Sequence, residues 1–388
     1  MLLLGMTPPR RIAIVMSRLP RLIEPQAVWL GALRAALRLI QRLDATLVTA
    51  DGTAGAEFSR RGADRLAINV EVLSISEDSL AEPAVPDGKV PARDRQLMAA
   101  AEMIIVLGLR TNGSIHRLLR HNLARVHRVL LVDLPGLQSQ AARDELVGLG
   151  ATLWSPTAEE QEPLCRSRAR SFDEHHADEI CEIVPVPTGP DWQFLSHTTR
   201  SCPGPWPTQS LNEYLDSLLD DSTDADHSAL ATLTRIVRLR HLRASSRFIR
   251  GGFQVVCLTQ TPLVELPRLR QFRIHRTKWD FEPFGLCIHR AWLQERGARP
   301  VIYGDEAKWD QLAEADRPFY QFVNRTDQDD ERHIIDWTVE QEWRHVGDLD
   351  LQTLPRESAY VFVPNFEAAR AISRISPWPV TLWPGSQG

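Results

Sequence analysis

The segment RIAIVMS, at residues 11–17, is apolar over almost its whole length. Such a segment predicts a β-strand that is buried on both faces. EMIIVLGL (residues 102–109) and RVLLVDL (residues 128–134) repeat this pattern, and LAINVEVLSI (residues 66–75) predicts a further strand. Stretches with apolar residues at helical spacing lie between the strands, as in PQAVWLGALRAALRLIQRL at residues 25–43. Apolar strands that alternate with helices of this length indicate a parallel sheet covered by helices on both faces. We therefore expect an α/β, doubly wound domain over residues 10–157.

The composition indicates a folded chain without a strong charge bias. The 388 residues are 43% hydrophobic and 24% charged, and the formal net charge of -5 argues against duplex nucleic acid as the main partner. The five cysteines are widely spaced and form no CxxC pair, so we expect a reducing, cytoplasmic location and no metal site. No apolar run approaches the length that spans a bilayer, so we expect no membrane partner.

The carboxyl-terminal half differs in pattern. Residues 158–222 are rich in charge and proline, and we interpret them as a partly helical connector. Residues 223–388 begin with a helical pattern at residues 227–245, and short apolar strands follow, which predicts a smaller α+β domain. Ten of the eleven tryptophans lie beyond residue 150, which predicts an aromatic core in this half.

Two loops of the first domain are candidates for ligand binding, because ligands of doubly wound sheets bind beyond the carboxyl ends of the strands. One is DGTAGAEFSRRGA at residues 51–63, whose glycines can bring backbone N–H groups close to a phosphate. The other is LRTNGSIHRLL at residues 109–119, where Ser114 is expected to cap a helix. Arg110 and His116 together favour an anionic ligand, whereas His116 taken alone is expected on the helix surface. Neither loop matches GxGxxG or a Walker A motif, which argues against an ordinary dinucleotide enzyme. The alternative is that the glycines are turn residues of an inactive scaffold.

The order of ADGTAGAEF (residues 50–58) and ARDRQLMAAAEMIIVLGLRTNGSIHRLL (residues 92–119) resembles the SLOG superfamily, the Rossmann-like domains related to the LOG and DprA proteins. The resemblance implies binding of a nucleotide or an NAD-derived signal. The positions that it implies are Gly52, Thr53 and Gly55 in the first phosphate loop, Arg93 on the facing helix, and Asn112, Gly113 and Ser114 in the second loop. The PGGxGT pattern of LOG enzymes is reduced here to RTNGS, and their catalytic Arg and Glu pair is not evident, so the resemblance favours binding over hydrolysis. A nucleotide hydrolase confined to this half is a third possibility.

The segment IDWTVEQEWRHVGDLDL, at residues 335–351, gathers charge on one side of a predicted strand. At a period of two, Glu340, Glu342 and Arg344 share one face, while Trp337 and Trp343 share the other. One interpretation is an active-site strand held by buried tryptophans. The other is a solvated face, or a helix on which Glu340 and Arg344 form an i, i+4 pair.

This segment also belongs to a second resemblance. GGFQVVCLTQTPL (residues 251–263), FEPFGLCIHRAWLQERGARPVIYGDE (residues 281–306) and DWTVEQEWRHVGDLDL (residues 336–351) are similar, in that order, to the AbiGi-type abortive-infection family of bacteria. That likeness implies a role in phage defence and no particular reaction. The late E-x-E pattern is also similar to that of ADP-ribosyltransferases.

The likeness to ADP-ribosyltransferases implies roles for the charged residues. Positive charge develops on the ribose when the bond to nicotinamide breaks, and Glu342 is the carboxylate that would stabilise it. Glu340 would activate the acceptor, and Arg344 would either hold a diphosphate or neutralise the glutamates.

The two halves together suggest a bacterial defence protein in which the first domain binds a nucleotide or NAD derivative and the second is an NAD-using effector. A protein partner from a defence system and a homo-oligomer are both compatible with this hypothesis. The alternative is a non-enzymatic antitoxin or phage-recognition protein, whose charged strand face is a docking surface.

Overall fold

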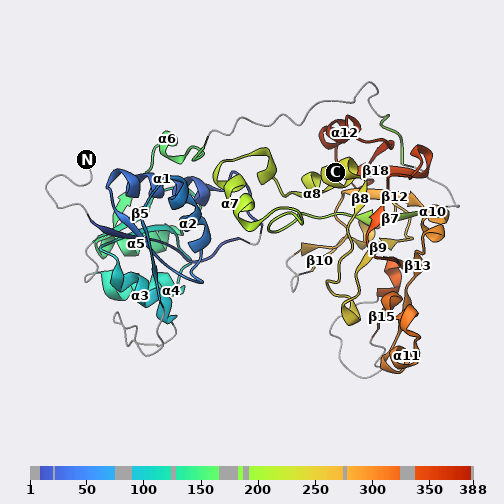
Figure 1. Cartoon of the computed structure of the whole chain (residues 1–388), viewed down its shortest axis with the longest axis horizontal. Coiled ribbons are helices and arrows are strands. Elements are labelled where there is room, and N and C mark those ends of the chain that lie inside the picture. The colour runs from blue at the N-terminus through green and yellow to red at the C-terminus, as the bar shows by residue number, and fades with distance from the viewer. Residues whose placement is uncertain are drawn as a thin grey trace. The chain divides into compact units, whose positions relative to one another are not determined.

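The structure, a computed structural model, divides into two compact units (Figure 1). Unit 1 comprises Met1–Ser171 and Pro203–His227, and unit 2 comprises Phe172–Cys202 and Ser228–Gly388. The described residues are 9–20, 22–74, 90–123, 128–165, 182–186, 192–273, 278–323 and 337–385. The segment 158–222, expected as a connector, is divided between the two units, and each unit draws regular elements from it.

Unit 1 contains a six-stranded sheet in the order β3-β2-β1-β4-β5-β6, in which every neighbouring pair is parallel. The strands are β1 (Arg11–Met16), β2 (Thr46–Ala50), β3 (Val70–Leu73), β4 (Met103–Gly108), β5 (Val129–Val132) and β6 (Thr152–Trp154). The helices are α1 (Val28–Arg42), α2 (Ala56–Arg65), α3 (Ala92–Ala100), α4 (Ser114–Asn122), α5 (Gln140–Gly148), α6 (Ala158–Gln161) and α7 (Leu211–Leu219). This strand order confirms the expected doubly wound, Rossmann-like fold.

Each central strand supplies side chains to two separate cores, because successive residues of a strand point to opposite faces of the sheet. Ile12 and Ile14 of β1 lie in the core that α1, α2 and α7 cover. Ala13 and Val15 lie in the core that α3, α4 and α5 cover. Burial on both faces is the reason why these strands are apolar throughout. Each fully buried leucine or isoleucine contributes about 1.5–3 kcal/mol to stability relative to an exposed one.

The edge strand β3 is shorter than expected from the sequence. An apolar stretch from Leu66 predicted the strand, but α2 continues to Arg65 and Ala67 has a left-handed φ of 53°. Only Val70–Leu73 pair with β2, and their side chains remain partly or largely exposed. Periodicity therefore predicted the strand correctly but not where it begins.

Unit 2 is an α+β unit, as expected, built on a seven-stranded sheet in the order β13-β16-β9-β7-β12-β18-β19. All neighbours are antiparallel except β18 and β19. Its strands are β7 (Phe194–Thr198), β9 (Val255–Thr259), β12 (Gly285–His289), β13 (Arg299–Pro300), β16 (Glu342–Val346), β18 (Ala359–Val363) and β19 (Val380–Leu382), and its main helices are α8 (Ala229–Leu239), α10 (Arg290–Glu295) and α12 (Phe366–Ser373). Shorter elements are β8 (His241–Leu242), α9 (Leu266–Leu269), β10 (Phe272–Arg273), β11 (Lys278–Trp279), β14 (Ile302–Gly304), α11 (Glu306–Gln311), β15 (Tyr320–Phe322) and β17 (Leu349–Asp350).

The main core of unit 2 lies between the sheet and α8, α10 and α12. It is mostly aliphatic and includes Trp292, Trp343 and Trp378, so the expectation of a predominantly aromatic core was wrong. Two of these indoles reach polar partners from within the core: Nε1 of Trp343 donates to Oε1 of Gln260, and Nε1 of Trp378 donates to the Leu354 carbonyl. Throughout the described part of the chain, no helix has the length and apolar character needed to cross a membrane.

Candidate functional site

A cavity of about 610 Å³ opens in unit 1 at the carboxyl ends of β1, β2 and β4. In the order β3-β2-β1-β4-β5-β6, successive strands are added to one side of β1 as far as β3 and to the other side from β4 onward. The switch point therefore lies between β1 and β4, and ligands of doubly wound folds bind there. Residues 17–19 after β1, 52–58 after β2 and 113–115 after β4 line the cavity. The two loops selected from the sequence thus meet in one place.

The first loop needs glycine at two positions. Gly52 and Gly55 have φ values of 74° and 80°, in the left-handed region that other residues rarely adopt. A Cβ atom at Gly55 would lie 2.9 Å from Sδ of Met16, and one at Gly52 would lie 2.8 Å from Nη1 of Arg93. Between them, Thr53 also lines the cavity, although its hydroxyl donates to the Ala50 carbonyl within the loop.

Three helices begin at this cavity without a side-chain cap. The N-cap residues of α2, α3 and α4 are Gly55, Pro91 and Gly113, none of which provides a side-chain hydrogen bond to the first turn. By contrast, Ser139 caps α5 and Ser210 caps α7. The first-turn N–H groups of a helix and its dipole favour an anion. The expectation that Ser114 caps α4 was wrong, because Ser114 is the first helical residue and lines the cavity instead.

Arginines add positive charge to these helix ends. Arg18, Arg93 and Arg110 line the cavity, and among the described residues Arg18 and Arg110 have no ion-pair partner. Arg93 lies 3.7 Å from Asp94, so the charge of this carboxyl is offset by a neighbouring guanidinium, and burial raises the pKa of Asp94. The other acidic lining residue, Glu57, forms an ion pair with Arg60 on the same helix. The cavity therefore suits a ligand that carries negative charge.

A buried histidine, His116, accepts a hydrogen bond from the backbone of the second loop. Asn112, with a left-handed φ of 59°, does not line the cavity, but its N–H donates to Nδ1 of His116 at 3.2 Å. Since Nδ1 accepts, the proton of a neutral ring is on Nε2, which lies 3.3 Å from Oε2 of Glu145. Burial lowers the pKa of His116, so the neutral ring prevails near pH 7. The expectation of a surface histidine was wrong, because α4 packs this face against α5.

Helix α7 lines a further side of the cavity that no sequence pattern predicted. Leu211, Tyr214 and Leu215 of α7 line it, although they lie about 100 residues beyond the second loop and in the segment interpreted as a connector. A local signal for α7 was present: Ser210 and Glu213 form a capping box, with reciprocal side-chain to backbone hydrogen bonds. Its place beside the cavity follows only from the tertiary structure.

In unit 2, the acidic segment is not one continuous strand. Trp337–Glu340 form a 3-10 turn, Gln341 has a left-handed φ of 43°, and the strand β16 begins only at Glu342. The expectation that Glu340 extends the strand face was therefore wrong, because Glu340 belongs to the 3-10 turn and the left-handed backbone of Gln341 separates it from the strand. Residues 335–336 and the side chain of Trp337 lie outside the described part of the structure.

Glu340, Glu342 and Arg344 nevertheless line one cavity, of about 200 Å³. Cross-strand pairing places Glu342 opposite Thr259 and Arg344 opposite Cys257, so both strands point polar side chains to this face. Trp343 points to the other face and is buried in the core. Ser196 and Thr198 of β7, Arg200, Arg247 and Asp280 complete the polar lining.

Arg344 is almost fully buried and has no donor left for a ligand. Nε and Nη2 donate to the two carboxylate oxygens of Glu342, at 2.9 and 3.1 Å. Nη1 donates to the carbonyls of Pro318 and Tyr320, and Nη2 donates a second bond to Oε1 of Gln321. These bonds occupy the five N–H donors of a guanidinium. Of the two roles considered for Arg344, the contacts match neutralisation and positioning of Glu342 and leave no donor for a diphosphate.

Two reactive side chains beside Glu342, Cys257 in the cavity and Tyr303 outside its lining, are held in their protonated forms. The packed surroundings and the nearby Glu342 carboxylate raise the pKa of the Cys257 thiol to about 12. Burial likewise raises the pKa of Tyr303, whose hydroxyl accepts from the Glu342 N–H, to about 12. Cys257 is therefore not a thiolate nucleophile at neutral pH. Within the described ranges, no three His, Cys, Asp or Glu side chains group as metal ligands would.

Comparison with protein-family models gave no match, and comparison with curated proteins gave none either. Among solved structures, the Moco carrier protein of Chlamydomonas reinhardtii is similar at 14% identity and a TM-score of 0.28, over 39% of this chain and 92% of that one. DNA processing protein A (DprA) from Streptococcus pneumoniae is similar at 13% identity and a TM-score of 0.28, over 38% of this chain and 58% of that one.

Proposed function

We propose that unit 1 binds a nucleotide, either a nucleoside phosphate or an NAD derivative, in the cavity at the ends of β1, β2 and β4. The observation that carries this proposal is the meeting of three uncapped helix N-termini and three arginines at one cavity. Backbone N–H groups at a helix start and guanidinium groups are the two donors that proteins use most often for phosphate.

The size and lining of the cavity support a ligand larger than a free phosphate. A volume of about 610 Å³ lies within the range that holds a small organic ligand. Besides the cationic side, the cavity has apolar lining from Leu19 and Phe58. A nucleotide presents these two kinds of surface, because its phosphates are anionic while its base and ribose are largely uncharged.

Binding can be tested with the full chain by titration calorimetry and thermal shift, with NAD, ADP-ribose, cyclic nucleotides and nucleoside triphosphates as probes. Arg110→Gln should weaken the best binder at least about tenfold, because a charge-assisted hydrogen bond to phosphate contributes roughly 1.5–3 kcal/mol. Arg120→Gln is the matched control, since Arg120 lies in the last turn of the same helix and does not line the cavity. Absence of binding by every probe would refute the proposal.

For unit 2 we propose, as a second candidate, an effector that cleaves the glycosidic bond of NAD in a defence response. Support comes from Glu340 and Glu342 at one cavity, where Arg344 holds the Glu342 carboxylate in place. A carboxylate beside the ribose stabilises the positive charge that develops as the bond breaks. At about 200 Å³ the cavity is smaller than a typical pocket for an organic ligand, so only one end of the dinucleotide would enter it and the remainder would lie outside.

The effector proposal is tested by NAD consumption, or by transfer of label from a tagged NAD, in the presence of the ligand of unit 1. Glu342→Gln should abolish the signal, and Glu367→Gln, on the exposed surface of α12, should leave it unchanged. If the Glu342→Gln signal equals the wild-type signal, the enzymatic proposal is excluded. The non-enzymatic alternative, a docking surface for an antitoxin or phage partner, is then favoured.

A further inference from the structure

We infer that α7 forms the wall that recognises the uncharged part of the ligand, and that Leu211 and Tyr214 are specificity determinants for nucleotides over inorganic phosphates. This inference rests on the proposed nucleotide-binding function of unit 1. It assigns a role to the segment Pro203–His227, which no sequence motif connected with the site.

The two sides of the cavity differ in chemistry. The helix starts of α2, α3 and α4 and the arginines Arg18, Arg93 and Arg110 supply N–H donors and positive charge. The lining residues that α7 supplies, Leu211, Tyr214 and Leu215, bring no charge. A ligand oriented with its phosphates toward the helix starts would therefore place its uncharged portion against α7, since burial of apolar surface is favourable there.

Leu211 is half-exposed, at 50% of its accessible surface, although it lines the cavity. Tyr214 and Leu215 are buried behind it, at 5% and 2%. A leucine in this position loses its remaining contact with water when a flat apolar group covers it, and this loss contributes to affinity. An inorganic phosphate cannot cover it, because it has no apolar surface.

The Tyr214 ring is fixed by its neighbours. It meets the ring of His227 edge-on, with centroids 4.9 Å apart, and His227 stacks on Trp206 at 4.1 Å. All three rings belong to the same segment, so the segment carries its own small aromatic core. A wall that is rigid before the ligand arrives loses less conformational entropy on binding.

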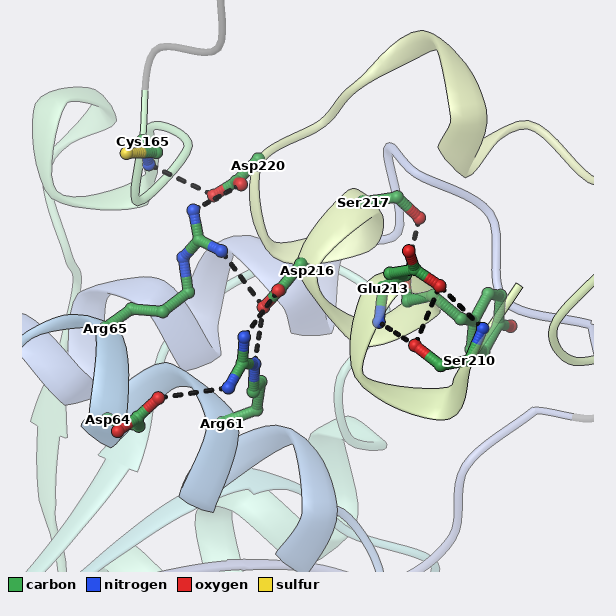
Figure 2. A network of polar contacts seen from close by, with 10 residues as sticks. Arg61, Asp64, Arg65, Cys165, Ser210, Glu213, Asp216, Ser217 and Asp220 are labelled. Atoms are coloured by element: carbon green, nitrogen blue, oxygen red, sulfur yellow. Dashed lines mark hydrogen bonds and ion pairs between the residues drawn. The ribbon is translucent and has the colours of Figure 1, made fainter. Parts of the chain in front are cut away.

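Ion pairs fasten α7 to α2 (Figure 2). Arg61 binds the Asp216 carboxylate through Nε and Nη2, at 2.7 and 2.6 Å, and Nη1 of Arg65 lies 3.0 Å from the same carboxylate. Arg65 also donates to Asp220, and the buried Arg34 of α1 donates to the carbonyls of Leu218 and Leu219 at the end of α7. Because α2 itself begins at the cavity, these contacts join the apolar wall to one of the phosphate-facing helices.

The test compares Leu211→Ala with Leu149→Ala in the full chain. Both leucines are exposed residues of unit 1, at 50% and 45%, and Leu149 does not line the cavity, so neither substitution threatens the core. The probes are the tightest-binding nucleotide of the calorimetric screen and inorganic pyrophosphate, the latter measured directly or as a competitor.

We expect Leu211→Ala to weaken nucleotide binding about five- to tenfold and to leave pyrophosphate binding unchanged, with Leu149→Ala equal to wild type for both probes. Equal nucleotide affinity of Leu211→Ala and wild type would overturn the assignment of the wall while nucleotide binding stands. Equal weakening of nucleotide and pyrophosphate would also overturn it, because the effect would then come from the phosphate side. If the wild type binds neither probe, the proposed function itself fails.

Discussion

Asp216→Asn is the substitution that most directly tests how α7 is held against α2 within unit 1. The carboxylate of Asp216 accepts from Arg61 and Arg65 of α2. Asparagine has the same shape but no charge, and its amide group would face guanidinium donors. Asp64→Asn is the matched control: Asp64 pairs with the same Arg61 at 3.0 Å, but its side chain is 71% exposed.

The free energy expected to be lost in Asp216→Asn follows from the geometry of the ion pairs. Asp216, Arg61 and Arg65 side chains are only 22%, 28% and 21% exposed, so water screens this pair less than a surface pair. Charge-assisted hydrogen bonds contribute about 1.5–3 kcal/mol each when buried, and with partial exposure we expect about 2 kcal/mol for the set. That energy corresponds to about a 30-fold change in the opening equilibrium of α7. For Asp64→Asn we expect less than about 0.5 kcal/mol.

The stability difference between wild type and Asp216→Asn should also depend on pH. Burial alone would raise the pKa of Asp216, but the hydrogen bonds from Arg61 and Arg65 outweigh burial and hold this pKa below its usual range. A carboxylate whose pKa is lowered by folding stabilises the folded state fully above its unfolded value of about 3.9, and this contribution is lost as the pH falls through the lowered value. The difference between wild type and Asp216→Asn should therefore be complete near pH 7 and shrink below about pH 4.

Hydrogen exchange measured by mass spectrometry on peptides that cover residues 211–219 reports the opening of α7 directly. Protection should fall about 30-fold in Asp216→Asn, while peptides from α5 and from unit 2 keep their wild-type rates. If the amides of α7 are equally protected in Asp216→Asn and Asp64→Asn at pH 7, the ion pairs of Asp216 do not hold α7 in place. A loss that persists undiminished at pH 2.5 would contradict the ionic origin of the effect.

Three further predictions concern single residues. Gly55→Val should lower the melting temperature of unit 1 through a cost of about 1–3 kcal/mol, because φ is 80° there and Met16 lies 2.9 Å from the new Cβ; unchanged melting in calorimetry would exclude that strain. Arg344→Met should destabilise unit 2 by about 3–5 kcal/mol, since it leaves the Glu342 carboxylate without its partner, and hydrogen exchange of β16 at the wild-type rate would contradict this. Cys257 is exposed like Cys165, but its thiol has a pKa of about 12, so at pH 8 only roughly one Cys257 thiol in ten thousand is a thiolate. Iodoacetamide should therefore label Cys257 slowly at pH 8, and labelling of Cys257 as fast as that of Cys165 would argue against the raised pKa.

The sequence alone determined the architecture of unit 1. Strands such as Arg11–Met16 are apolar on both faces because helices cover both faces of the sheet. Their apolar composition therefore predicts a sheet between two layers of helices. The position of the cavity also followed, since the carboxyl ends of parallel strands meet at one edge of a sheet. Gly52, Gly55 and Gly113 could be selected on that basis, because a turn and a helix start impose local conformations that local sequence reveals.

Only the tertiary structure decided which distant groups complete each site. The capping box at Ser210 predicts a helix, but the contact of that helix with the cavity depends on Arg61 and Arg65, about 150 residues earlier in the chain. The period-two pattern around Glu342 was right from residue 342 to 344 and failed at Gln341, whose left-handed backbone has no signature in side-chain polarity. The sequence left two roles open for Arg344, and only the structure decides between them, because folding brings the carbonyls of residues 318 and 320 close enough to take its remaining donors. Local patterns record local conformation and burial, whereas a binding site is assembled from contacts whose partners are far apart in the chain.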